Sequence, residues 1–184
     1  ISTNRDGDLG LAYAGKSTSQ IDYAGGAYSF NDQLSVMLHA AQFKDLMNQY
    51  YSNVNYILPL SDTQAFTFDF NIYRSVDSGQ AEAGDINLTA ASLSAAFSTG
   101  PHKFLLAIQR NDGDQPQDYA AIGSTRPGVA AGVYSGGIYL ANATEISDFN
   151  APNERSVQVR YDLDMSTFGV PGAKFTLKHL RGYD

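Results

Sequence analysis

Hydrophobic and polar residues alternate one by one along much of the chain. A period of two is the side-chain repeat of a β-strand, so each such segment is predicted to be a strand with one apolar and one polar face. The segment from Ala65 to Arg74 is the clearest case, because three phenylalanines and Ile72 share one parity. Together with weaker examples, the pattern predicts nine strands and an all-β chain. They lie at or around residues 8–14, 20–30, 34–41, 49–58, 65–74, 87–98, 104–108, 156–163 and 174–178.

The connections between these strands fall into two alternating sets. Those at 31–32, 59–64, 99–102 and 165–172 are short and contain the Pro, Gly, Asn and Asp typical of tight reversals. Those at 44–48, 75–85 and 111–154 are mostly longer, and the last is polar and rich in glycine. Strict alternation predicts antiparallel neighbours with one plain rim and one elaborated rim. Outer-membrane β-barrels have this layout.

A soluble β-sandwich or a lipocalin-like barrel also alternates, but it turns its apolar face inward. Parity alone does not say which face is inside. Full charges in mid-strand on the polar face, among them Asp69, Asp162 and Lys178, favour the membrane barrel, because a dry core accepts them only at a cost. Aromatic residues near the strand ends, such as Tyr56 and Phe97, point the same way.

Composition narrows the function classes. The 184 residues include no cysteine, which excludes a disulfide framework, a thiolate zinc site and an iron–sulfur cluster. The formal net charge of −7 has the wrong sign for a general nucleic-acid binder, so no nucleic-acid partner is expected. No apolar run has the length of a membrane-spanning helix.

Several segments resemble the OprD family of outer-membrane porins, also called outer-membrane carboxylate channels. The resemblance implies monomeric barrels of about 18 strands in Pseudomonas-type Gram-negative bacteria, with a narrow pore for small carboxylate solutes. Residues 1–184 are then expected to be the central part of a single barrel domain, with about nine of its strands and a long outer loop at about 111–154. The segments that carry the resemblance are 49–56, 68–74, 83–86, 139–142, 147–150, 158–163 and 168–172.

The function expected from this resemblance is passive, substrate-selective diffusion of aromatic or organic acids or amino acids across the outer membrane. The expected partners are outer-membrane lipid, lipopolysaccharide and the solutes themselves. No enzymatic activity and no cofactor are expected. The alternative is a surface-exposed barrel that acts as an adhesin or receptor through its long loop.

Arg160 and Lys178 are the sharpest candidates for the pore wall. Both lie on the polar faces of strands that flank the turn at 165–172, and folding that hairpin about its midpoint places residue 160 opposite about 177. In the family, inward basic residues guide substrate carboxylates. The alternative is that Arg160 pairs with Asp162 and only braces the wall.

The resemblance also implies that the long loop enters the lumen and narrows it. Asp148, with Ser147 beside it and Glu145 nearby, is then expected to face the constriction opposite the basic wall. Acid on one side and cations on the other would orient dipolar solutes. The alternative is that Asp148 only caps a turn of the loop.

The remaining charged residues suggest no catalytic or metal site. Of the three histidines, only His179 has outward parity near an aromatic residue, as an outer-membrane phospholipase would need, and nothing else supports that activity. No metal cluster is predicted. Arg74, Arg110 and Arg181 share the parity of the apolar face at its outer end, where arginine side chains extend toward lipopolysaccharide phosphates.

Overall fold

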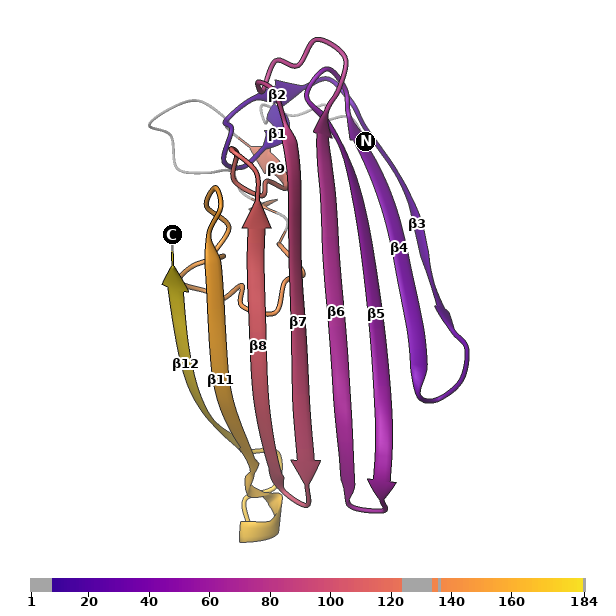
Figure 1. The fold of residues 1–184 in the computed structure, drawn as a ribbon, viewed down its shortest axis with the longest axis vertical. Helices are drawn as coiled ribbons and strands as arrows, with labels where there is room; N and C mark the ends of the chain where they lie inside the picture. Colours follow the sequence, from indigo (N-terminus) through magenta and orange to yellow (C-terminus); the bar gives the residue numbers. More distant parts are fainter. Residues whose placement is uncertain (1–7, 124–133, 136, 184) are drawn as a thin grey trace.

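The main element of the fold is one antiparallel sheet of eight strands. A computed structural model describes residues 8–123, 134–135 and 137–183. The strand order is β12-β11-β8-β7-β6-β5-β4-β3, so adjacent strands follow one another along the chain, except that β9 and β10 lie between β8 and β11 in the sequence (Figure 1). The strands are β3 (Ile21–Ser29), β4 (Leu34–Phe43), β5 (Met47–Ser61), β6 (Gln64–Asp77), β7 (Asn87–Thr99), β8 (His102–Asp112), β11 (Arg155–Asp164) and β12 (Lys174–Tyr183).

A second, smaller sheet has the order β10-β9-β1-β2. It corrects one prediction: the segment expected as a barrel strand at 8–14 forms the short β1 here, which leaves eight described strands in the main sheet instead of nine. The physical reason is that Leu9 and Leu11 are buried with Phe43, Met47 and Leu88 of the main sheet, so their alternation reflects packing on the sheet. The strands are β1 (Asp8–Leu11), β2 (Ser17–Thr18), β9 (Ala120–Gly123) and β10 (Tyr134–Ser135).

The two kinds of connection lie at opposite ends of the main sheet (Figure 1). Tight reversals join β3 to β4, β5 to β6 and β7 to β8 at one end, where the 3₁₀ helix η1 (Met165–Phe168) also links β11 to β12. The small sheet and the long connection from β8 to β11 lie at the other end. Within the described residues, no helix is long and apolar enough to cross a membrane.

The faces of the main sheet are inverted relative to those of a soluble protein. Leu106 and Ile108 are 63% and 58% exposed on the apolar face. Gln109 and Gln158 of the polar face are only 3% and 4% exposed. A soluble sandwich would bury the aliphatic side chains and expose the amides. The apolar face is therefore the outer face of this sheet, and the polar face is the inner one.

A row of aromatic residues crosses the outer face near the tight reversals. Phe66, Phe97, Phe104 and Tyr161 are direct partners across β6, β7, β8 and β11. The ring centroids of Phe66 and Phe97 lie 5.0 Å apart, and those of Phe104 and Tyr161 lie 5.1 Å apart. Such a row is the aromatic girdle that marks one membrane interface in a transmembrane barrel.

Candidate functional site

The long connection between β8 and β11 folds back over the inner face of the sheet. Ile138 and Leu140 are buried against Tyr51 and Tyr73 of that face. The backbone N–H of Ala141 donates a hydrogen bond to Ser92 Oγ at 2.9 Å. In Figure 1 this orange connection lies behind β7 and β8. Residues 137–154 therefore cover the polar side of the wall.

The side chain of Gln109 in β8 forms hydrogen bonds with both ends of a short turn-containing segment of this connection. Its Oε1 accepts from the backbone N–H of Asn142 at 3.0 Å. Its Nε2 donates to the carbonyl oxygens of Asp148 and Phe149 at 2.8 and 2.9 Å. One buried side chain thus holds residues 142 and 148–149 together, and we call residues 143–147 between them the loop tip.

Neighbouring amides reinforce this attachment. Gln158 Nε2 donates to the Ala141 carbonyl at 2.8 Å and to Asn142 Oδ1 at 3.1 Å. Asn142 Nδ2 donates to Ser156 Oγ at 2.9 Å. The contacts join uncharged groups, so salt screens them little, and the loop stays attached to the wall without using charge.

The loop tip carries two of the three constriction residues predicted from the sequence. Glu145 is exposed, and Ile146 beside it is 94% exposed. A tight turn closes the tip, since the backbone N–H of Thr144 donates to the Ser147 carbonyl at 2.9 Å. Ser147 Oγ accepts from the backbone N–H of Phe149 at 3.2 Å, so the capping role considered for Asp148 belongs to Ser147.

Asp148 lies at the base of the tip, where two phenols donate to its carboxylate. Tyr13 and Tyr119 approach its Oδ2 at 2.8 and 3.4 Å. Burial is the main cause that raises the pKa of both tyrosines, and the nearby Asp148 raises it further. The two hydroxyls therefore stay protonated and act as donors.

Asp118 fixes the two tyrosines. Its carboxylate accepts from the backbone N–H groups of Tyr13, Ala14 and Tyr119 at 2.8–2.9 Å. Burial raises the pKa of the Asp118 carboxyl, although these N–H donors act in the opposite direction. The partners of this carboxylate are thus backbone groups of the segments that carry the two tyrosines.

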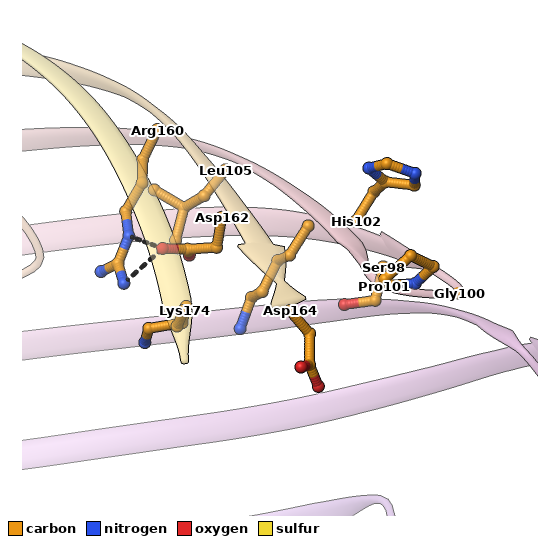
Figure 2. Close-up of a pocket in the computed structure, with 10 residues that line it drawn as sticks. Ser98, Gly100, Pro101, His102, Leu105, Arg160, Asp162, Asp164 and Lys174 are labelled. Atoms are coloured by element: carbon orange, nitrogen blue, oxygen red, sulfur yellow. Dashed lines mark hydrogen bonds and ion pairs between the residues drawn. The ribbon is translucent and has the colours of Figure 1, made fainter. Parts of the chain in front are cut away.

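Arg160 and Lys178 are direct partners across β11 and β12, on the inner face. The predicted partner, about residue 177, was off by one position. Arg160 bonds Asp162 Oδ1 through Nε at 3.0 Å and through Nη2 at 2.9 Å (Figure 2). The same oxygen accepts from Thr176 Oγ1 at 2.6 Å. The Asp162 pairing considered for Arg160 is present, whereas the Lys178 side chain is exposed.

Two further lysines face inward near the tight reversals. Lys103 is the partner of Asp162, and Lys174 is the partner of Asp164. With Arg160 they line a hollow of about 260 Å³ (Figure 2). Sequence reasoning missed Lys103 as a wall residue because the predicted strand began at Phe104. It placed Lys174 on the polar face by parity but gave it no role.

Catalytic and metal sites are not apparent in the described residues. Within 8–123, 134–135 and 137–183, no three residues among His, Cys, Asp and Glu are grouped so that they could hold a metal ion. His179, the outward histidine considered for an outer-membrane phospholipase, is exposed within β12, the edge strand of the main sheet. His102 Nδ1 lies 2.8 Å from the Tyr161 hydroxyl, within the aromatic row.

An exposed apolar outer face, an aromatic row at one end and a polar inner face covered by a returning loop define the wall of an outer-membrane β-barrel with a loop-lined interior. The model of the outer membrane porins of the OprD family matches residues 2–184. The chain therefore belongs to the OprD family of outer-membrane porins. Members of this family are channels of the bacterial outer membrane and not enzymes, as the sequence predicted.

Individual relatives agree with this assignment. The chain is 47% identical to "Porin D" of Pseudomonas aeruginosa over 97% of this chain and 39% of that protein. A crystal structure of Pseudomonas aeruginosa OprD superposes with a TM-score of 0.85 and 46% identity, over 95% of this chain and 44% of that one. The structure of OccD3 (OpdP) from the same organism has a TM-score of 0.83 and 32% identity, over 100% of this chain and 42% of that chain. The chain thus spans about two fifths of the length of these relatives.

The lipid-facing assignment of the apolar face predicts a strong effect of charge there. Leu106→Arg, in mid-strand on β8, is expected to lower the free energy of unfolding from a bilayer by about 2–4 kcal/mol. Leu105→Arg on the inner face is the matched control and is expected to cost much less, since it faces the lumen. Denaturant unfolding of the full-length protein in lipid vesicles measures both. Equal losses for the two variants would contradict the assignment of the faces.

Proposed function

We propose that the porin containing this chain conducts small carboxylate solutes by passive diffusion through a pore that its long loop constricts. The solutes are aromatic or organic acids or amino acids. The barrel is monomeric, with outer-membrane lipid and lipopolysaccharide around it. The observation that carries the proposal is that Gln109 and Gln158 hold the loop against the polar inner face, below which the wall is basic.

The charge distribution supports an anion-conducting path. Lys178 extends from the wall beside Arg160, and Lys103 and Lys174 follow toward the tight reversals. A carboxylate that passes one cation therefore remains within reach of the next. Asp148 and Glu145 belong to the loop, which supports a constriction with acid on one side and basic groups on the other.

The adhesin or receptor alternative gains no support from the described part of the long loop. Residues 138–150 use their backbone groups on the inner face of the sheet, through Ser92, Gln109 and Gln158. A receptor loop would present such groups away from the barrel. This part of the chain is better suited to lining a pore.

Blockade of ion current tests the proposed solute class. The full-length porin in a planar bilayer is exposed to benzoate or to benzamide, which differ in charge and hardly in shape. Benzoate is expected to interrupt the current at concentrations about tenfold lower than benzamide, because only benzoate is held by the basic wall. Ohmic channels with equal sensitivity to the two solutes would contradict carboxylate selectivity. Absence of ohmic channels would contradict the pore itself.

Neutralising the loop acids tests the opposite side of the constriction. The double variant Glu145→Gln/Asp148→Asn is expected to shift the reversal potential in a salt gradient toward greater anion selectivity, since two negative charges leave the lumen. Asp62→Asn, in the exposed reversal between β5 and β6, is the control for loss of an acidic residue. An unchanged reversal potential in the double variant would show that the tip does not face the ion path.

A further inference from the structure

Lysine and arginine are distributed unevenly between the two faces of the main sheet. The outward-facing ones in the described strands are all arginines and lie toward the long-loop end. The lysines of these strands, Lys103, Lys174 and Lys178, all face inward, and Arg160 is the one arginine of these strands that does so. Arginine differs from lysine in its planar guanidinium, which forms paired hydrogen bonds with phosphate. The outward arginines are Arg74, Arg110, Arg155 and Arg181.

Arg110 and Arg155 form the centre of this group. They are direct partners across β8 and β11, so two like charges project side by side from the outer face. Arg110 has one exposed ionic partner, Asp112, at 3.4 Å. Arg155 has no ionic or hydrogen-bond partner among the side chains of the described residues. The pair therefore retains a net positive charge and free donors.

An apolar groove of about 500 Å³ begins beside the pair and runs down the outer face. It is hollow because Ala91, between Ile72 and Arg110 in the sheet register, has only a methyl side chain. The walls are aliphatic and aromatic, and the two arginines close the upper end. Its apolar side chains are Phe70, Ala91, Leu93, Ile108 and Val157.

The height of the arginine pair fits a membrane interface. Arg110 lies six positions beyond Phe104 of the aromatic row, which is about 20 Å along an extended strand and about 15 Å along the membrane normal at a strand tilt of about 40°. The apolar band of a transmembrane barrel is about 25 Å tall. If the aromatic row marks one interface, the arginine backbone lies in the upper part of the apolar band, and the long side chains extend toward the headgroups of the opposite leaflet, on the side of the long loops.

We propose that this groove and the Arg110–Arg155 pair form a binding site for a phosphorylated, multiply acylated glycolipid of the outer leaflet, with the chemistry of lipid A. The two guanidinium groups bind one phosphate, whose charge removes the repulsion between them. An acyl chain occupies the groove beside Ala91. The site faces away from the lumen and does not depend on which solute the pore conducts.

Native mass spectrometry of the full-length porin in detergent, with bisphosphorylated lipid A added, tests the site. Arg110→Gln/Arg155→Gln is expected to reduce the bound fraction about tenfold, because both phosphate-binding groups are lost. Ala91→Leu keeps both charges but fills the groove, and is expected to weaken binding severalfold. Lys16→Gln/Lys44→Gln removes the same charge from exposed loop positions and is expected to bind like the parent.

Each variant is first checked for the gel shift on heating that a folded barrel gives. Equal losses in the arginine and lysine double variants would overturn the site in favour of general charge attraction. Parental binding by Ala91→Leu would overturn the acyl-chain placement. Equally tight binding of lipid A stripped of both phosphates would overturn the role of the arginines. Benzoate block in the same variants reports separately on the pore, and it is expected to be unchanged.

Discussion

Replacing Arg160 and Lys178 together by glutamine is expected to weaken the block of ion current by benzoate about tenfold, while block by benzamide stays the same. The two residues are direct partners on the inner face, so an anion at that level lies near both positive charges. Their removal lowers the local charge by two at the level that the proposed path must cross. Dose–response curves from single channels of the full-length porin measure the change.

Asp162 provides a variant with the opposite expected sign. Its Oδ1 accepts hydrogen bonds from Nε and Nη2 of Arg160 and from the Thr176 hydroxyl. Asp162→Asn leaves a residue of the same size but removes the negative charge, so Arg160 becomes available to a passing carboxylate. Benzoate is then expected to block at concentrations a few times lower than in the parent channel.

Lys16→Gln/Lys44→Gln, at exposed positions outside the main strands, controls for the net charge of the protein. It is expected to leave both solutes unaffected. If Arg160→Gln/Lys178→Gln also behaves like the parent, the basic wall is not part of the solute path. If Asp162→Asn weakens the block, the ion pair of Arg160 with Asp162 serves to position Arg160 in the wall, and does not reduce its interaction with passing carboxylates.

Much of the fold can be predicted from the alternation of apolar and polar residues, because successive side chains of a strand point to opposite faces whatever strands lie beside it. The segment 65–74 shows this, since its phenylalanines lie on the outer face and Asn71 and Tyr73 lie on the inner face, as predicted. Parity did not reveal which face was inside. That answer came from burial, in which Gln109 is covered and Ile108 next to it is exposed.

The pairing of strands was harder to predict than their faces. The hairpin from β11 to β12 contains η1, which Asp164 caps at its start and Gly169 ends in the left-handed conformation. A midpoint estimate assumes a symmetric turn and so gave residue 177 in place of Lys178 as the partner of Arg160. One position matters in a strand, because residue 177 faces lipid and residue 178 faces the lumen.

The contacts between the long loop and the sheet could not be predicted from the sequence. Gln109 lies at a polar position of β8, and nothing local distinguishes it from other polar wall residues. Its partners, Asn142 and Asp148, are more than 30 residues away, and two of its three contacts are to backbone carbonyls. The resemblance to the family predicts a loop in the lumen, but the side chain that holds it is identified only by the structure.

Gln109→Met is therefore expected to release the loop tip. Methionine has nearly the same length but lacks the amide, so the three hydrogen bonds to residues 142, 148 and 149 are lost together. At about 0.5–1.5 kcal/mol each, this is a loss of about 1.5–4.5 kcal/mol from the attachment of the loop. Single-channel recordings are expected to show frequent transitions between conductance levels, in place of one steady level, because the tip moves in and out of the lumen.

A spin label reports the same motion directly. The printed chain has no cysteine, and Ile146, at 94% exposure, accepts a label at Ile146→Cys without disturbing packing. Its spectrum is expected to become more mobile in Gln109→Met, whereas Gln64→Met, at an exposed position whose amide bonds Thr99, is expected to leave it unchanged. A general loss of barrel stability would remove the gel shift on heating in Gln109→Met. A retained gel shift with an unchanged spectrum would instead mean that Gln158 and Ser92 hold the tip without Gln109.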